Sequence, residues 1–375
     1  MEKQVQELIG WKKAIVILGP RQVGKTTLLQ RLFPPSQTGA RWFNGEDSET
    51  RNLFIEPSAI RLKAILGDAE TIVFDEAQRI PSVGLVIKMI VDNHPEKNIM
   101  VTGSSVLELA DGIQESMTGR KWELHLYPIS FEEMSAHLGY MEAHALLEHH
   151  LRFGFYPRVI NHAGKEEMNL RELRNSYLYK DILAYQQVKK PAVLEKLLRA
   201  LAHQIGNEVA HHELGQLVGL DPHTVERYID LLEKAFIVFP LQSLSRNMRN
   251  EIKRSRKIYF HDLGIRNAMI SRFNPMEERD DMGMLWENFC IVERMKTLEY
   301  HQKYVNRYFW RTHTQQEIDY IEEYDGKLHA YEFKWNPDAK VKIQKTFLEA
   351  YPGTEIKVIT PKNFHEFVAI EDVKK

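Results

Sequence analysis

The sequence predicts an α/β protein with a parallel β-sheet in its N-terminal part, a largely helical middle part and a second α/β unit at the C-terminus. Strand-like runs alternate with helical patterns over the first 130 residues, which is typical of parallel strands covered by helices. The runs are residues 14–18, 40–44, 71–76, 98–105 and 122–127. Helical patterns dominate residues 131–245, and the pair Asp325-Gly326 then favours a tight β-hairpin.

Composition and charge are those of an ordinary globular protein. The 375 residues are enough for two or three domains, with 43% hydrophobic and 27% charged residues. The net charge of −2 provides no overall attraction to nucleic acid or membranes, so any such binding needs a local patch. The single cysteine, Cys290, fits a reducing compartment. Because the N-terminus is polar and no apolar run would span a bilayer, we expect a cytoplasmic protein that does not bind membranes.

The run at residues 14–18 leads into a glycine-rich loop of the pattern G-x-x-x-x-G-K-[ST], and a helical pattern follows. Glycines let successive backbone N–H groups face one anion, while Lys25 supplies positive charge to the outer phosphates and Thr26 a hydroxyl for Mg²⁺. The pattern predicts that a nucleoside triphosphate binds to this loop. The binding residues are Gly19, Pro20, Arg21, Gln22, Val23, Gly24, Lys25, Thr26 and Thr27.

Two acids, Asp75 and Glu76, end the apolar run at residues 71–76. Ligands of parallel sheets bind at the carboxyl ends of the strands, so both acids should face the phosphate loop. There Asp75 would hold Mg²⁺, and Glu76 would orient and deprotonate the attacking water. The second acid therefore predicts hydrolysis of the nucleotide rather than storage alone.

Thr102 and Arg120 are candidates for contacting phosphate. Thr102 lies near the end of the run at residues 98–105, where a hydroxyl can touch the γ-phosphate or the water. Arg120 precedes the run at residues 122–127, and its planar guanidinium suits phosphate oxygens, in its own site or as a finger supplied to a neighbouring subunit. A plain turn and a surface arginine are the alternative interpretations.

The end of the N-terminal domain is marked by Ser130 and Glu133, which have the spacing of a capping box. We therefore expect the nucleotide-binding core at residues 1–130 and a helical lid at residues 131–190.

Residues 213–260 read as helix, turn, helix and two strands, with Asp221 as cap and Pro222 at the first helical position. This order predicts a winged-helix domain, which we place at residues 191–270. The segment 246–257 carries six basic residues against one acid and would contact nucleic-acid phosphates without reading sequence. A solvated hairpin that only packs between domains is the alternative.

A hairpin at Asp325-Gly326 places Asp319 opposite Glu332 on neighbouring strands. Lys334 shares their face, and two opposed carboxylates repel unless a divalent cation lies between them.

These residues match the D…E-x-K pattern of the PD-(D/E)xK nuclease fold, in which Asp319 and Glu332 hold metal and Lys334 lies near the reacting phosphate. Glu287 would complete the site as the upstream helical acid. We place this domain at residues 271–375. A cross-strand charge cluster without metal is the alternative.

As a whole, the chain resembles prokaryotic AAA-type ATPases that carry a C-terminal domain of unknown function, family number 4143. The resemblance covers nearly the full length. It rests on residues 19–27, 74–78, 102–105, 118–120, 179–182, 259–264, 286–288, 310–319 and 332–334. It implies ATP binding and hydrolysis, a winged-helix segment and a restriction-endonuclease-like terminal domain. Phe155 departs from the family pattern, which often has glycine there.

These features together predict a Mg²⁺-dependent ATPase, possible as a homo-oligomer, whose hydrolysis moves or gates the nuclease-like domain on nucleic acid. The alternative is a nucleotide-switched regulator whose winged helix and C-terminal domain only bind DNA or a protein partner. A transport or chaperone ATPase is a third interpretation, for which the chain shows no pore-loop aromatic motif.

Overall fold

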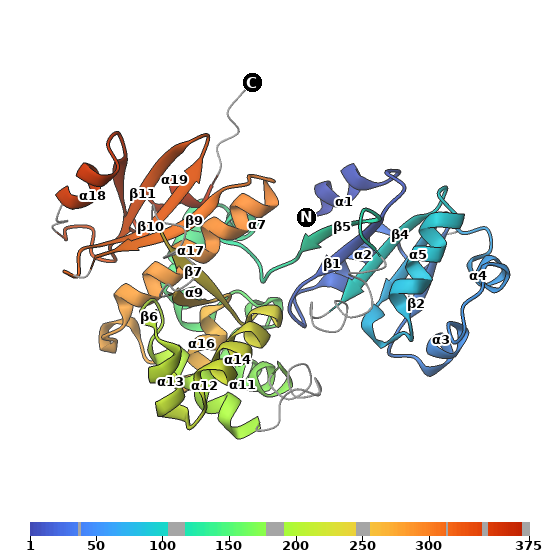
Figure 1. Ribbon diagram of the computed structural model, residues 1–375, viewed down its shortest axis with the longest axis horizontal. Helices are drawn as coiled ribbons and strands as arrows, with labels where there is room; N and C mark the ends of the chain where they lie inside the picture. The colour runs from blue at the N-terminus through green and yellow to red at the C-terminus, as the bar shows by residue number, and fades with distance from the viewer. Residues whose placement is uncertain are drawn as a thin grey trace. The chain divides into compact units, whose positions relative to one another are not determined.

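The computed structural model describes residues 1–36, 39–103, 117–177, 191–244, 256–312, 314–339 and 344–369 (Figure 1). The chain divides into two compact units. The first holds Met1–Tyr127 and two short later segments. The second holds Pro128–Leu178, Val188–Glu233 and Ile237–Lys375.

A five-stranded parallel sheet forms the core of the first unit, in the order β2-β3-β4-β1-β5. Its strands are β1 (Ala14–Leu18), β2 (Ala40–Asn44), β3 (Thr71–Asp75), β4 (Asn98–Gly103) and β5 (Lys121–His125). The continuous apolar strands β1 and β3 are buried along their full length, whereas the mixed strands β2 and β5 lie at the edges and are partly exposed. The predicted parallel sheet is confirmed.

Short helices precede and connect these strands. They are α1 (Glu2–Leu8), α2 (Lys25–Leu32), α3 (Ser48–Leu53), α4 (Ala59–Leu66), the 3-10 turn η1 (Ala77–Arg79) and α5 (Val83–Asn93). Helix α5 buries Val83, Val86, Ile87 and Ile90, which share one face because of the 3.6-residue period.

The helices of the second unit precede and flank its sheet. They are α7 (Phe131–Leu138), α8 (Tyr140–Ala145), α9 (Leu147–Phe153), α10 (Pro157–Ile160), α11 (Glu166–Tyr177), α12 (Pro191–His203), α13 (His211–Val218), α14 (Pro222–Lys234), α16 (Leu263–Ile270), η3 (Met276–Glu278), α17 (Met282–Tyr300), α18 (Lys345–Ala350) and α19 (Phe364–Val368). The predicted capping box of Ser130 and Glu133 begins α7. Asp221 accepts the N–H of Thr224 and caps α14, which starts at Pro222 as predicted.

A seven-stranded sheet runs through the second unit in the order β12-β11-β10-β9-β7-β8-β6. Its strands are β6 (Glu208–Val209), β7 (Val238–Ser243), β8 (Arg256–Phe260), β9 (Asn306–Arg311), β10 (Glu317–Tyr324), β11 (Lys327–Phe333) and β12 (Glu355–Ile359). The antiparallel pair β7–β8 joins the C-terminal strands where Gln242 pairs with Tyr308 and Ser243 with Phe309. Strands from the predicted winged-helix segment and from the predicted nuclease-like segment therefore form one sheet.

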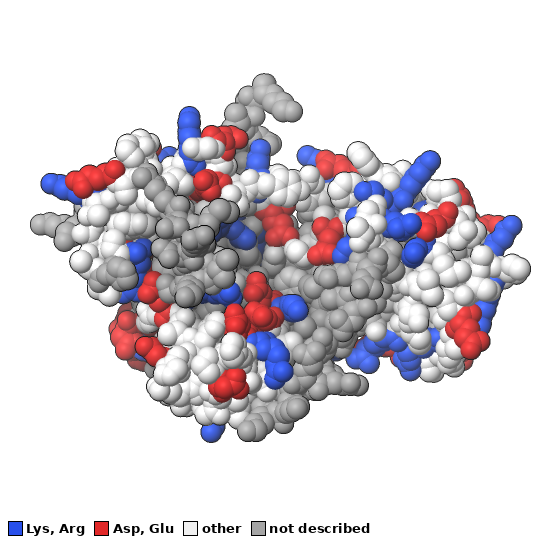
Figure 2. Space-filling view, viewed as in Figure 1, with Lys and Arg blue, Asp and Glu red and all other residues white. Residues whose placement is uncertain are grey.

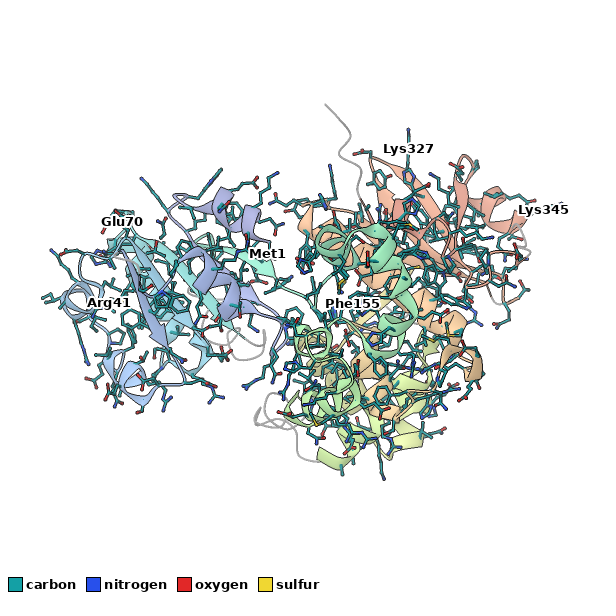
Figure 3. All side chains as sticks on the ribbon, turned by 180° about the vertical axis from the view of Figure 1, so that it is seen from behind. Met1, Arg41, Glu70, Phe155, Lys327 and Lys345 are labelled. Atoms are coloured by element: carbon teal, nitrogen blue, oxygen red, sulfur yellow. The ribbon has the colours of Figure 1, made fainter. Side chains whose placement is uncertain are left out.

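The β10–β11 hairpin has the predicted register. Tyr324 pairs with Lys327, the residue labelled at the start of β11 in Figure 3, and Tyr320 pairs with Tyr331. Asp325 and Gly326 form the turn with φ angles of 51° and 71°.

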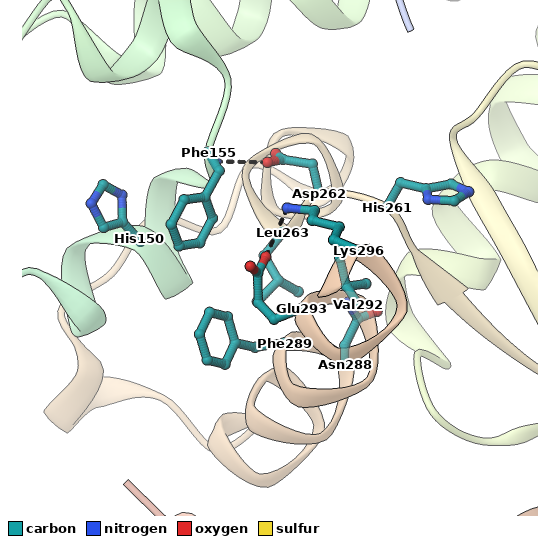
Figure 4. A pocket seen from close by; sticks show the side chains of 10 residues that line it. All are labelled: His150, Phe155, His261, Asp262, Leu263, Asn288, Phe289, Val292, Glu293 and Lys296. Atoms are coloured by element: carbon teal, nitrogen blue, oxygen red, sulfur yellow. Dashed lines mark hydrogen bonds and ion pairs between the residues drawn. The ribbon is translucent and has the colours of Figure 1, made fainter. Parts of the chain in front are cut away.

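Phe155, which departs from the family pattern, fills space beside α17. Its ring stacks on His150 at 4.5 Å between centroids, and its N–H donates to Asp262 at 2.7 Å (Figure 4). Asp262 also caps α16 by accepting the N–H of Ile265. The phenylalanine thus joins the loop before α10 to two helices that follow much later in the chain.

Within the described ranges, no helix combines the length and the apolar character that crossing a membrane requires. Basic and acidic side chains are interspersed on the visible face of each unit (Figure 2).

Candidate functional site

The loop between β1 and α2 has the backbone shape of a phosphate cradle. Gly24 takes a left-handed conformation at the start of α2, with φ of 101°, and Gln22 has φ of 61°. A side chain at Gly19 would be impossible, because its Cβ would lie 2.0 Å from the carbonyl oxygen of Leu126. The glycine therefore lets the loop pass directly beside the end of β5.

Lys25 turns its side chain back into this loop. It is only 4% exposed, and its Nζ donates to the carbonyl oxygens of Gly19 at 2.8 Å and Pro20 at 2.7 Å. A buried ammonium needs such acceptors, and the outer oxygens of a triphosphate are stronger ones. The geometry places the charge where a phosphate chain would lie.

Thr26, Asp75 and Thr102 meet at the carboxyl edge of the sheet. The Thr26 hydroxyl lies 3.0 Å from each carboxylate oxygen of Asp75. Thr102 donates to Asp75 Oδ1 at 2.5 Å and accepts the N–H of Glu76 at 3.1 Å. The strand order explains the meeting, because β4, which carries Thr102, lies between β1 and β3.

These residues fit a nucleotide with bound Mg²⁺. A hydroxyl and a carboxylate are the hard oxygen donors that Mg²⁺ prefers, and the loop amides at a helix N-terminus suit phosphate. Every residue from 19 to 27 that we predicted to bind nucleotide lies on this loop or on the first turn of α2.

Glu76 is held in an unusual backbone conformation directly after β3. It has φ of 48°, which is rare for a residue with a side chain and indicates a position fixed by its surroundings. Gln78 Nε2 donates to Glu76 Oε2 at 2.7 Å and so orients the carboxylate. From the sequence we assigned no role to Gln78, although it lies within residues 74–78, one of the segments that resemble the family. Only its position two residues after Glu76 could have indicated this contact.

Arg120 lies at the opposite edge of the sheet. Its carbonyl oxygen accepts the N–H of Ala14 at the start of β1, whereas the phosphate loop follows the end of that strand, roughly 13 Å further along. Its Nε donates to Asp92 at 2.6 Å, near the end of α5. The structure therefore does not bring Arg120 to the loop of its own chain.

Asp319, Glu332 and Lys334 come together as predicted from the hairpin. Lys334 Nζ lies 2.9 Å from Glu332 and 3.6 Å from Asp319, and the N–H of Phe333 donates to Asp319 at 2.8 Å. Glu332 Oε1 is buried and lacks a hydrogen-bond partner among the described residues. Burial and the nearby charge of Asp319 raise the pKa of Glu332 to about 7.

Glu287, on α17, is held by residues of β8. Lys257 Nζ lies 3.0 Å from Glu287, and the Tyr259 hydroxyl donates to the same carboxylate at 2.6 Å. Lys257 also pairs with Glu317. Burial raises the pKa of Glu287 even though the Lys257 ammonium opposes that shift.

The position of Lys257 corrects one expectation. We predicted that it belongs to a basic wing contacting nucleic-acid phosphates, but its side chain is 2% exposed and forms ion pairs with carboxylates inside the protein. Arg256 lies 3.9 Å from Glu226, and residues 246–255 of the predicted wing lie outside the described ranges, as do Ser104, Ser105 and residues 179–182.

Three residues of this region were missed by sequence reasoning. Glu317 could have been found, because it lies two residues before Asp319 and a strand alternates its faces. Lys257 and Tyr259 gave no local signal. In the described part of the chain, no three acidic, histidine or cysteine side chains converge closely enough to hold a metal ion by themselves. As arranged, the cluster does not form a complete divalent-metal site.

Comparisons with known proteins cover most of the chain. Family models match an AAA domain at residues 11–135, a Domain of unknown function (DUF8612) at residues 144–276 and a Domain of unknown function (DUF4143) at residues 282–370. An uncharacterized protein of Mycobacterium tuberculosis is 28% identical over 325 residues, which cover 85% of this chain and 70% of that protein. An uncharacterized protein of Methanocaldococcus jannaschii is 22% identical over 302 residues, or 75% of this chain and 66% of that protein.

Two solved structures show weaker likeness. The RuvB Holliday junction branch migration motor of Thermotoga maritima is 16% identical, covers 66% of this chain and 88% of its own, and has a TM-score of 0.30. A structure of Drosophila ORC bound to DNA is 13% identical, covers 73% and 95%, and has a TM-score of 0.26. The AAA match supports a nucleotide-dependent ATPase. The chain carries an AAA domain and a C-terminal DUF4143 domain, the combination that its motifs predicted.

Proposed function

We propose that this protein binds ATP with Mg²⁺ at the loop of residues 19–27 and hydrolyses it. The observation that carries the proposal is the meeting of Thr26, Asp75 and Thr102 at the carboxyl edge of the sheet, directly beside the buried ammonium of Lys25. A fold-only role for these residues would not require two hydroxyls and a carboxylate to converge beside a glycine-rich loop.

Each side chain has a distinct task in this proposal. The loop amides and Lys25 bind the phosphates, and Thr26 with Asp75 would hold Mg²⁺, which neutralises charge on the phosphate oxygens when bound. Glu76 accepts a proton from the attacking water while Gln78 holds its carboxylate in place. Thr102 is fully buried and contacts both Asp75 and the N–H of Glu76, so it acts by positioning these two acids.

Arg120 serves a neighbouring copy of the chain in this proposal. It lies at the amino edge of the sheet, away from its own phosphate loop, and about a third of its side chain is exposed. A guanidinium offered from that edge would reach a nucleotide only across a contact between subunits. The proposal therefore includes a homo-oligomer.

Measuring phosphate release from ATP by the full-length protein tests the ATPase proposal. The Lys25→Ala variant should lose nucleotide binding. The Glu76→Gln variant should bind ATP but hydrolyse it at least roughly 100-fold more slowly than wild type, because only the proton acceptor is lost. Wild-type turnover no faster than that of Lys25→Ala would overturn the assignment.

We further propose that ATP hydrolysis is coupled to the second unit acting on nucleic acid. Helices α13 and α14, followed by the β7–β8 hairpin with β6 beside it, have the order of a winged helix. Asp319, Glu332 and Lys334 have the spacing and proximity of a nuclease-like site. Both features support nucleic acid as the partner.

The second candidate is a nucleotide-switched regulator that binds DNA or a protein without cutting. It is favoured by the capture of Glu287 by Lys257, which leaves the nuclease-like cluster incomplete. Incubation with plasmid, linear and single-stranded DNA and with RNA in Mg²⁺ or Mn²⁺ separates the two. Cutting that disappears in Asp319→Ala and Lys334→Ala favours the nuclease, and binding without cutting favours the regulator.

A further inference from the structure

Lys257 lies inside the C-terminal acidic cluster although it comes from a strand at the far side of the sheet. It belongs to β8, which is separated from β10 by β7 and β9. Its ammonium nevertheless pairs with Glu317 of β10 and with Glu287 of α17, 3.0 Å away. The aromatic ring of Phe309 on β9 lies 5.4 Å beneath it and helps to shield it from water.

The cluster contains more carboxyl groups than cations. Its carboxyl groups are Glu287, Glu317, Asp319 and Glu332, and its cations are Lys257, Lys334 and Arg311, whose Nε lies 3.8 Å from Glu317. Carboxylates so far from water persist only when cations or hydrogen-bond donors hold them. Lys334 pairs with Asp319 and Glu332. Lys257 pairs with Glu287 and Glu317.

We propose that the Lys257 ammonium competes with a divalent cation for this cluster and keeps the site latent. Glu287 cannot turn to a metal shared with Asp319 and Glu332 while Lys257 and Tyr259 hold its carboxylate. A divalent cation can therefore bind all three carboxylates only when the Lys257 ammonium moves away from Glu287. This inference rests on the proposed nuclease-like function and names how that site is regulated.

A competing ammonium makes a prediction that a purely structural ion pair does not. Removing it should uncover affinity for a divalent cation, because Glu287 then loses its ammonium partner and Glu317 keeps only the Arg311 guanidinium, 3.8 Å away. The binding energy of that cation should also stabilise the fold, since the cation binds the folded state.

The test measures Mn²⁺ binding to full-length, nucleotide-free protein by the loss of the free-ion electron paramagnetic resonance signal. Lys257→Met should bind Mn²⁺ at least ~10-fold more tightly than wild type, and Mn²⁺ should raise its Tm with a concentration dependence that wild type lacks. The double variant Lys257→Met with Asp319→Asn should lose the gained binding, which assigns it to this cluster.

Lys296 supplies a matched control. It is also buried, at 1% exposure, and pairs with Glu293 at 2.7 Å, but that pair lies outside the acidic cluster. Lys296→Met should lose stability without any rescue by Mn²⁺. Lys257→Gln, which is one atom shorter but keeps a hydrogen-bond donor without the charge, repeats the measurement if the methionine variant does not fold.

The outcomes are distinct. If wild type and both Lys257 variants bind Mn²⁺ equally through Asp319, the metal site stands and the competition is wrong. If none of them binds Mn²⁺ in an Asp319-dependent way, the inference and metal-dependent nuclease chemistry fall together. ATP turnover that depends on Lys25 is measured separately, so neither result bears on the ATPase proposal.

Discussion

The hydroxyl of Thr102 donates to Asp75 at 2.5 Å and links the neighbouring strands β4 and β3 at the edge where nucleotide is proposed to bind. The same oxygen accepts the N–H of Glu76 at 3.1 Å, so one side chain positions both acids. A threonine that did no more than end a strand would have no need for both contacts.

Replacing Thr102 with valine keeps the shape of the side chain and removes both contacts. We expect kcat for ATP hydrolysis to fall roughly tenfold to hundredfold, with nucleotide affinity changed far less, because Lys25 and the loop are untouched. Steady-state kinetics and calorimetric titration with ATP measure the two effects. Thr102→Ser should retain most activity; a valine variant as fast as wild type would show that the hydroxyl has no role in turnover.

Gln78 acts through Glu76 and is therefore a positioning residue. In Gln78→Ala the carboxylate of Glu76 loses a donor at 2.7 Å and is no longer held in one orientation. We expect a kcat that is lower by roughly tenfold with ATP affinity nearly unchanged, because the residues that bind the phosphates are untouched. Gln78→Asn keeps the amide on a side chain one carbon shorter and should recover little of the lost activity. A Gln78→Ala variant as fast as wild type would contradict the assigned role.

Arg120 provides a test of trans action. Arg120→Ala should have low activity alone, whereas mixing it with inactive Glu76→Gln protein should restore turnover, because the second protein supplies an intact arginine to the first protein's site. The control mixes Arg120→Ala with the double variant carrying both changes, which should restore nothing. Absence of recovery in the first mixture, or full activity of Arg120→Ala by itself, would argue against a shared site.

Local patterns predicted which residues meet at the carboxyl edge of the first sheet, because each pattern lies within a short stretch of the sequence. A strand, a glycine-rich loop and a helix follow one another over residues 14–32, and Asp75 and Glu76 end a buried strand whose carboxyl end must face that loop. The position of Arg120 at the amino edge of the sheet could not be predicted, because it follows from the parallel pairing of β5 with β1, which the hydrophobic periodicity does not reveal.

In the C-terminal cluster, too, some residues could be predicted from local patterns and others could not. The turn at Asp325-Gly326 fixed the register that brings Asp319 toward Glu332, so those two were predictable. Lys257 was not, because its contact with Glu287 depends on a sheet that joins β7 to β9, and the local composition around it favours a solvated basic segment. Charge patterning alone therefore misassigned a buried lysine.

Glu332 should make stability depend on pH. Its pKa is about 7 in the folded protein and 4.5 as the ordinary value, so the folded state binds this proton more tightly. The resulting stabilisation is complete below about pH 4.5 and is lost as pH rises through about 7. Glu332→Gln cannot ionise and should remove this loss, which we expect to be on the order of 2 kcal/mol.

Urea unfolding at pH 5 and pH 8 with a chelator measures that difference. Glu349→Gln, an exposed change on α18, serves as the control and should follow wild type. If Glu332→Gln and wild type lose the same stability between the two pH values, the carboxylate is not the group responsible.

Gly154 tests whether the loop before α10 is as tightly built as the structure shows. Its φ is 72°, and a Cβ there would lie 2.2 Å from a carboxylate oxygen of Asp262, the group that receives the N–H of Phe155. Gly154→Ala should therefore destabilise the protein by about 2 kcal/mol or more, since both the backbone conformation and the capping carboxylate must shift. Gly164, which also has positive φ, 82°, but has nothing within 4 Å of its Cβ position, is the matched control and should cost only the smaller backbone strain. Chemical denaturation of both alanine variants measures the difference, and equal losses would show that the contact with Asp262 adds nothing to the strain of the backbone.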